Sequence, residues 1–274
     1  MRNTPHDIGL VISTVDDTLL TPDRTLTPRS IEAVQRLLDA GIAFTLTSSR
    51  PPRGLLPLIE GLGLTAPLAA LDGALIIGPD LDVIVEHRMD RSAAESAINV
   101  LGAGGFDVWV YTADEWLVSG AGGPHVDREA GTVGFRPTVV GDFGGVLGRI
   151  VKVVGVNDDR VAVVRTTAEV RRRCGSRVVV TSSQPFSVDV ADPLSNTGEV
   201  AMALADAFDL PVDRVAVIGH RASDVPMFEL SGASIAMGNA TPTVREAARF
   251  VAPSNADEGF AAAIEQFVLG TATA

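Results

Sequence analysis

Residues 215–237 read Val-Ala-Val-Ile-Gly-His-Arg-Ala-Ser-Asp-Val-Pro-Met-Phe-Glu-Leu-Ser-Gly-Ala-Ser-Ile-Ala-Met, and this stretch decides the fold. An apolar run, Val215–Gly219, is followed by a helical segment, Ser223–Leu230, and by a second apolar run, Ala233–Met237. Continuous apolar runs are typical of strands that are buried on both faces of a parallel sheet. The order strand, helix, strand therefore predicts a crossover unit whose ligands lie at the carboxyl ends of the strands.

The same alternation opens the chain. Ile8–Thr14 is an apolar run that ends in small polar residues, and Pro28–Ala40 carries apolar residues at helical spacing before a second run, Ile42–Leu46. A helix opened by Pro51, a short strand at 68–71 and a helix at 198–208 extend the pattern. The sequence predicts an α/β fold with a doubly wound, Rossmann-like parallel sheet.

Between these two halves the pattern changes. Residues 108–111, 150–154 and 178–181 are short strand-like runs, and residues 160–173 form a helical segment. This mixture is typical of an antiparallel sheet with helices. We expect a core domain built from residues 1–83 and 187–274, with an inserted α+β cap domain at 84–186.

Composition limits the partners and the compartment. The 274 residues carry a net charge of −12, which disfavours binding to nucleic acid or to an anionic membrane. The only cysteine, Cys174, cannot form an internal disulfide, and the short apolar run near the N-terminus is too short for a signal peptide or a membrane span. We expect a cytoplasmic protein. Lysine occurs once, at Lys152, so we expect no lysine at the site.

Three later segments, Gly219–Phe228, Ala236–Ala240 and Ser254–Gly259, resemble the closing signature of the Cof-type phosphatases of the haloacid dehalogenase (HAD) superfamily. With the matching opening motif and the inserted cap, the resemblance covers almost the whole chain. It implies a HAD core with a cap, phosphomonoester hydrolysis and a Mg²⁺ cofactor.

The opening motif departs from the family at its first position. Thr14-Val-Asp-Asp-Thr-Leu-Leu20 is similar to the motif in which one aspartate attacks phosphorus and a second, two residues later, is the general acid/base. The resemblance places the acid/base on Asp16, but Thr14 stands at the nucleophile position and Asp17 replaces a glycine. A threonine hydroxyl is not ionised at neutral pH and needs a base to attack.

The remaining motifs supply predicted contacts to a phosphoryl group. Ser48-Ser-Arg-Pro51 matches the second motif, which assigns substrate binding to Ser48, Ser49 and Arg50, together with Thr14. Both serines also suit the start of a helix, and capping and anion binding use the same geometry. The third motif has a lysine where this chain has Thr197, which we also expect to contact the substrate.

The metal-binding motif is also incomplete. The family anchors Mg²⁺ with an aspartate after the glycine and a second carboxylate four residues later, whereas this chain has His220 and Asp224. The predicted metal ligands are Asp16, Asp224 and His220. Because Mg²⁺ prefers several hard oxygen ligands, we expect weak binding at most.

These substitutions favour a pseudo-phosphatase that binds a small phosphorylated molecule or inorganic phosphate without hydrolysing it. An active metal-dependent hydrolase that uses Asp16 or a metal-bound water with His220 is one alternative. A structural or partner-binding protein with an empty pocket is another. The sequence leaves open whether the protein is an enzyme.

Overall fold

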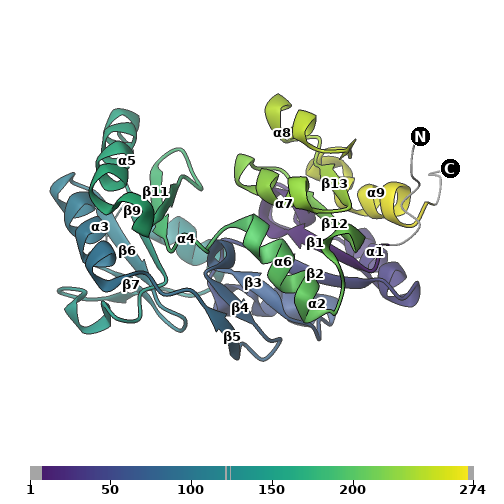
Figure 1. Cartoon of the computed structure of the whole chain (residues 1–274), viewed down its shortest axis with the longest axis horizontal. Helices are drawn as coiled ribbons and strands as arrows, with labels where there is room; N and C mark the ends of the chain where they lie inside the picture. Colours follow the sequence, from purple (N-terminus) through teal and green to yellow (C-terminus); the bar gives the residue numbers. More distant parts are fainter. Residues whose placement is uncertain (1–7, 121, 124, 271–274) are drawn as a thin grey trace.

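A computed structural model describes residues 8–120, 122–123 and 125–270, which form two sheet-containing domains (Figure 1). The core domain carries an eight-stranded sheet. Across this sheet the strands follow the order β14 (Phe250–Val251), β13 (Ala233–Ala236), β12 (Val215–Gly219), β1 (Leu10–Thr14), β2 (Ala43–Thr47), β3 (Leu68–Ala70), β4 (Leu75–Ile77) and β5 (Val83–Glu86). All pairs from β14 to β3 are parallel, and β4 and β5 add an antiparallel edge.

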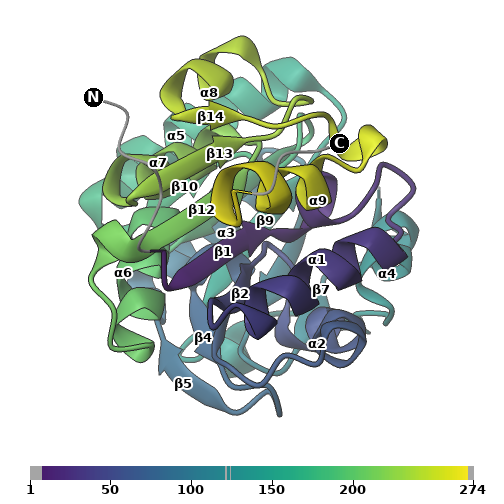
Figure 2. The same cartoon turned by 90° about the vertical axis from the view of Figure 1, so that its right-hand side faces the viewer.

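Helices cover both faces of the core sheet (Figure 2). Val11 of β1 belongs to the apolar cluster under one set of helices, α1 (Pro28–Asp39), α2 (Leu56–Leu62) and α9 (Gly259–Ala263). Its neighbours Leu10 and Ile12 belong to the cluster under the other set, α6 (Thr197–Ala207), α7 (Val225–Leu230) and α8 (Pro242–Ala247). Because successive strand residues point to opposite faces, β1 is buried on both sides, as the doubly wound prediction requires.

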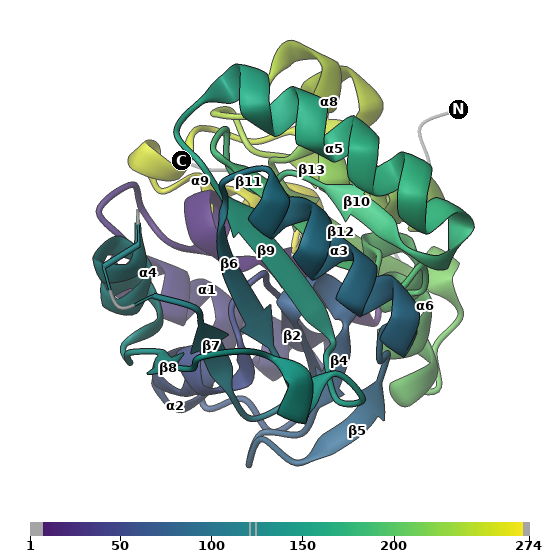
Figure 3. The same ribbon diagram turned by 90° about the vertical axis from the view of Figure 1, so that its left-hand side faces the viewer.

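The cap domain carries a second, six-stranded sheet. Its strands follow the order β10 (Val179–Thr181), β11 (Ser187–Ala191), β9 (Lys152–Val156), β6 (Asp107–Tyr111), β7 (Trp116–Val118) and β8 (Thr138–Val139). Only β7 and β8 pair in parallel. Helices α3 (Arg91–Ala103) and α5 (Arg160–Cys174) cover one face (Figure 3), and α4 (Val126–Val133) lies toward the core.

Strand pairing corrects the two predicted domain boundaries. β5 pairs with β4 of the core sheet, although most of its residues fall in the segment predicted as cap. β11 pairs with β9 of the cap sheet, although residues 187–191 were predicted to belong to the core. A short apolar run does not reveal which sheet its hydrogen bonds join, so the sequence could not place either strand.

Smaller differences concern the ends of elements. The strand predicted at 150–154 begins at Lys152, and the helix predicted at 223–230 begins at Val225 after a 3₁₀ turn, Ala222–Asp224. Pro51 precedes a 3₁₀ turn, Pro52–Leu55, which leads into α2. Within the described ranges, no helix combines the length and the apolar character needed to cross a membrane.

Candidate active site

The carboxyl ends of β1, β2 and β12 meet at one edge of the core sheet, where they place Thr14, Ser48 and His220 around a small pocket, the core pocket. Its polar lining residues are Thr14, Asp16, Thr47, Ser48, Ser49, Asp72, Thr197, His220, Arg221, Ser223 and Asp224. Of the predicted site residues, only Arg50 lies outside this lining. The alternating strand and helix pattern therefore brought the correct loops together, as expected for strand ends of an α/β sheet.

The Thr14 side chain is the first of three uncharged groups that are joined by hydrogen bonds. Its hydroxyl donates to the hydroxyl of Thr18 over 2.6 Å, and Thr18 Oγ1 lies 3.0 Å from Nδ1 of His220. Burial, reinforced by the neighbouring guanidinium of Arg221, lowers the pKa of His220 to about 4. The imidazole is therefore uncharged at neutral pH, and a base with so low a pKa removes a proton from a hydroxyl poorly.

Asp16 and Arg50 engage each other. Nε of Arg50 donates to one carboxylate oxygen over 2.9 Å, and its terminal nitrogen donates to the other over 2.6 Å. The Arg50 side chain is only 8% exposed, so this two-pronged ion pair is largely shielded from water. The predicted phosphate-binding guanidinium is thus occupied by the predicted acid/base.

Asp224 organises the loop that follows β12. Its Oδ2 accepts hydrogen bonds from the backbone N–H groups of His220 and Arg221, each over 2.9 Å. These contacts fix the 3₁₀ turn that leads into α7, as a capping carboxylate does at the start of a helix. Burial of the carboxyl group nevertheless raises the pKa of Asp224.

Ser48 and Thr197 also use their hydroxyl groups locally. Oγ of Ser48 accepts from the backbone N–H of Arg50 over 3.1 Å, which shapes the turn after β2. The hydroxyl of Thr197, the first residue of α6, donates to the carbonyl oxygen of Ser223 over 2.6 Å. Thr197 therefore ties α6 to the loop before α7 and brings no positive charge to the pocket.

The structure corrects the expectation that no lysine reaches the site. Lys152 projects from β9 of the cap, and its Nζ lies 2.6 Å from Oδ2 of Asp72 in the core and 3.1 Å from Oδ1 of Asp189 in the cap. Asp72 lines the core pocket from the turn after β3, where its φ of 58° is left-handed. Burial alone would lower the pKa of Lys152, but the two carboxylates outweigh burial and raise it.

Sequence reasoning missed this bridge although a signal was present. Lys152 interrupts an apolar strand, and a lysine in such a position is buried only when it is paired. Its partners lie 80 and 37 positions away along the chain, as the residue numbers show, and no local pattern links them. The bridge joins the cap to the edge of the core pocket.

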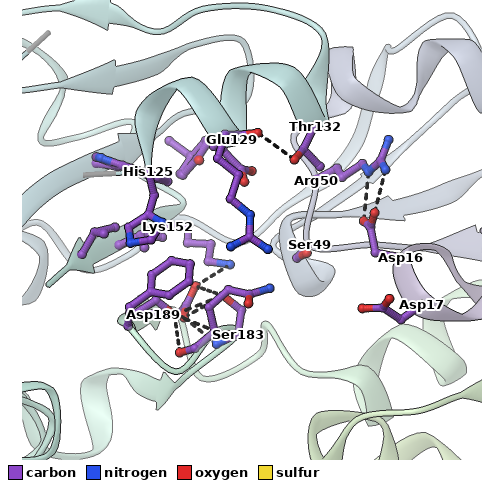
Figure 4. A pocket seen from close by; sticks show the side chains of 18 of the residues that line it. Asp16, Asp17, Ser49, Arg50, His125, Glu129, Thr132, Lys152, Ser183 and Asp189 are labelled. Atoms are coloured by element: carbon purple, nitrogen blue, oxygen red, sulfur yellow. Dashed lines mark hydrogen bonds and ion pairs between the residues drawn. The ribbon is translucent and has the colours of Figure 1, made fainter. Parts of the chain in front are cut away.

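Above the core pocket lies a cavity of about 210 Å³ between the two domains, the interdomain cavity. Figure 4 shows its walls, with Asp16, Ser49 and Arg50 on the core side and His125, Glu129, Lys152, Ser183 and Asp189 on the cap side. Asp16, Ser49 and Arg221 line both spaces, so the cavity and the core pocket are adjacent.

The model of the haloacid dehalogenase-like hydrolases matches residues 11–264, which include both domains and the loops of the core pocket. The chain belongs to this family. HAD phosphatases generally use Mg²⁺, and the resemblance to the Cof-type members is confirmed.

Two relatives illustrate the similarity. A 5-amino-6-(5-phospho-D-ribitylamino)uracil phosphatase, YitU, of Bacillus subtilis is 25% identical over 288 residues, which cover 97% of this chain and 99% of the relative. The pyridoxal phosphate phosphatase YbhA of Escherichia coli is 24% identical over 258 residues, covering 90% and 94%.

Solved structures agree on the fold. A HAD-like hydrolase from Bacteroides thetaiotaomicron superposes with a TM-score of 0.85 at 22% identity, covering 94% of this chain and 99% of that one. One from B. subtilis superposes with a TM-score of 0.87 at 17% identity, covering 95% and 100%. At these identities the likeness establishes the HAD core and cap and leaves the chemistry to the site itself.

Proposed function

We propose that this protein is a pseudo-phosphatase that binds a small phosphorylated molecule in the core pocket without hydrolysing it. The observation that carries the proposal is the uncharged hydrogen-bonded chain from Thr14 through Thr18 to His220, because the family resemblance puts Thr14 at the position of the nucleophile. Covalent phosphoryl transfer needs an anionic or activated nucleophile, and the Thr14 hydroxyl, which reaches the weakly basic imidazole only through Thr18, provides neither.

Loss of the nucleophile dominates the expected rate. Removing a covalent nucleophile lowers turnover by roughly 10⁴-fold or more in well-studied hydrolases. The engaged Asp16 and the neutral Thr197 act on the same transition state, so their effects need not multiply. Phosphate binding depends on features that remain in this chain. Thr197 begins an 11-residue helix, so the positive end of the helix dipole lies at the core pocket, which Arg221 also lines.

We also infer that Mg²⁺ binds weakly at this site. Asp16 is held by Arg50, Asp224 accepts two backbone N–H groups, and His220 offers nitrogen where Mg²⁺ prefers oxygen. In the part of the chain that the structure describes, no group of three His, Cys, Asp or Glu side chains is arranged to hold a metal ion. These residues do not fit the octahedral oxygen set of the family, so no step is assigned to the metal.

The test is a phosphatase assay on purified protein with sugar and nucleotide phosphates, in Mg²⁺, Mn²⁺, Zn²⁺ or chelator. We expect no turnover by the native protein and measurable, Mg²⁺-dependent turnover by the triple variant Thr14→Asp, Thr197→Lys, His220→Asp. The matched control replaces Thr14 with Asn in the same triple background, which keeps the shape of the aspartate without its nucleophilic oxygen. Turnover by the native protein that requires Asp16 would contradict the proposal.

Binding is tested separately by thermal unfolding. Inorganic phosphate and phosphate esters should raise the melting temperature, because a ligand that binds only the folded state stabilises it by mass action. A Ser49→Ala variant should respond less, since Ser49 lines both the core pocket and the interdomain cavity. No shift with any phosphate compound would favour a structural or partner-binding role.

An active hydrolase is the second candidate, because the relatives named above are phosphatases. Its distinguishing result is turnover by the native protein that is lost in Asp16→Asn. For either function we infer a cytoplasmic location from the buried, unpaired Cys174, and we infer that nucleic acid is not a partner because the net charge is −12.

A further inference from the structure

The interdomain cavity gathers positive charge in a protein whose net charge is −12. Two of its cations are already neutralised by carboxylates, Arg50 by Asp16 and Lys152 by Asp189 and Asp72. Three further cationic side chains line the same cavity: Arg24, Arg128 and Arg221. Within the described residues, none of the three forms an ion pair with a carboxylate. Nε of Arg221 donates to Nε2 of His220 over 3.3 Å, so the terminal nitrogens of Arg221 and the guanidinium groups of Arg24 and Arg128 are the donors that face a ligand without a carboxylate partner.

The remaining carboxylates of the cavity do not offset these arginines fully. The Asp17 side chain is 53% exposed, and its Oδ2 lies 3.9 Å from Nε2 of His220. Within the described residues, Asp17 forms no ion pair with an arginine. Burial raises the pKa of Glu129, which favours its neutral form relative to an ordinary glutamate. The unpaired groups therefore leave an excess of positive charge that suits an anion.

One wall of the cavity is built in advance of any ligand. The rings of His125 and Phe186 stack in parallel with centroids 3.8 Å apart, and the Arg128 guanidinium lies 6.0 Å from the Phe186 ring. The loop that carries Phe186 is fixed because Asp189 accepts from the backbone N–H of Ser183 over 2.8 Å and from the hydroxyl of Ser187 over 2.7 Å. Arg128 therefore packs against a stacked ring pair, His125 and Phe186, whose loop is held in place by hydrogen bonds.

The opposite side presents Arg24 from a tight turn of the core. Arg24 has a left-handed φ of 64°, its N–H donates to the carbonyl oxygen of Thr21 over 2.8 Å, and Asp23 accepts hydroxyl bonds from Thr21 and Thr25. A non-glycine residue in this conformation costs of order 1 kcal/mol or more and persists where its surroundings hold it. The turn thus keeps Arg24 at the cavity from the core side.

We propose that the interdomain cavity recognises a second anionic group, a carboxylate or a phosphate, on the organic part of the ligand, and that Arg24 and Arg128 bind it. The phosphoryl group occupies the core pocket, and Arg221 lines both spaces between the two anions. The cavity of about 210 Å³ is smaller than the roughly 300–1,000 Å³ of pockets for drug-sized ligands, which favours a short sugar acid phosphate or sugar bisphosphate. This inference rests on the proposed function and names its ligand class.

The test compares phosphate esters that differ only in the second anion. The matched pairs are glycerol 3-phosphate with 3-phosphoglycerate, sorbitol 6-phosphate with 6-phosphogluconate, and fructose 6-phosphate with fructose 1,6-bisphosphate. Calorimetric titration gives each Kd for the native protein and for Arg24→Gln and Arg128→Gln. The control is Arg165→Gln, an exposed arginine of α5 that lines neither space.

We expect the doubly anionic member of at least one pair to bind about tenfold or more tightly, since a charge-assisted hydrogen bond contributes roughly this much. The preference should fall to below about threefold in Arg24→Gln and Arg128→Gln and persist in Arg165→Gln. Carboxylate and phosphate are distinguished by which pairs show the preference.

Three results overturn the inference. If single phosphates bind as well as their doubly anionic partners, the second-anion site is wrong while the proposed function stands. If no compound binds, both fail together. A preference that survives in both cavity variants also removes the assignment to Arg24 and Arg128.

Discussion

Replacing Lys152 with Met should destabilise the cap strongly. The Lys152 side chain is 5% exposed and that of Asp189 is 3% exposed, so the substitution leaves a buried carboxylate without its cation. Breaking a buried ion pair in this way costs about 3–5 kcal/mol. Asp189 keeps its hydrogen bonds from Ser183 and Ser187, which favours the lower end of that range.

The assay is urea unfolding followed by tryptophan fluorescence. Both tryptophans, Trp109 and Trp116, lie on cap strands, so their emission reports on the cap while far-UV circular dichroism reports on the whole chain. With a urea m-value of about 2 kcal/mol/M, a loss of about 3 kcal/mol lowers the cap midpoint by about 1.5 M.

Two further variants isolate the cause. Asp72→Asn removes only the contact across the domains, and because the Asp72 side chain is 37% exposed the expected loss is about 1 kcal/mol or less. The double variant Lys152→Met, Asp189→Asn should recover most of the stability, since the only carboxylate left without its cation is Asp72, whose side chain is 37% exposed. An unchanged midpoint in Lys152→Met alone would refute the reasoning.

Three other substitutions test the core. His220→Asn should flatten the pH dependence of stability. In the folded protein, burial and the charge of Arg221 lower the pKa of His220 to about 4, although Asp16 opposes them. The unfolded chain therefore binds a proton at this imidazole at higher pH than the folded protein does. Denaturant titrations of the wild type should show the free energy of unfolding falling by about 3 kcal/mol as the pH drops from 6.5 to 4. Gly73→Ala should cost about 2 kcal/mol or more in urea unfolding, because φ is 92° and the new Cβ would lie 2.3 Å from a methyl group of Val200, whereas adding Val200→Ala should restore part of the loss. Asp224→Ala should lower stability by about 1–2 kcal/mol in the same assay through two lost backbone hydrogen bonds, and a neutral result would show that the loop holds itself.

The core sheet was predictable because its signal is local. Apolar runs such as Val215–Gly219, followed by helical spacing, specify buried parallel strands from neighbouring residues alone. The same runs identify the strand ends, so the loops of Thr14, Ser48 and His220 could be predicted to meet.

What the sequence could not give is which side chains bind one another. Asp16 was predicted as an acid/base and Arg50 as a phosphate ligand, each read from its own motif, while their ion pair depends on the packing of two loops. The contact from Lys152 to Asp72 joins two domains, and no sequence pattern around either residue indicates it. The one available signal was that a lysine within an apolar strand must have a carboxylate partner, and this signal does not identify the partner.

The burial of the single lysine makes the protein its own reporter of domain opening. Amine-reactive acylating reagents meet one lysine side chain in the whole sequence, and Lys152 is 5% exposed between cap and core. Modification of the peptide containing Lys152 therefore requires the domains to part or the cap to open locally. The acylation rate, followed by mass spectrometry with and without a phosphate ester, would measure how often the cap lifts without any label being introduced.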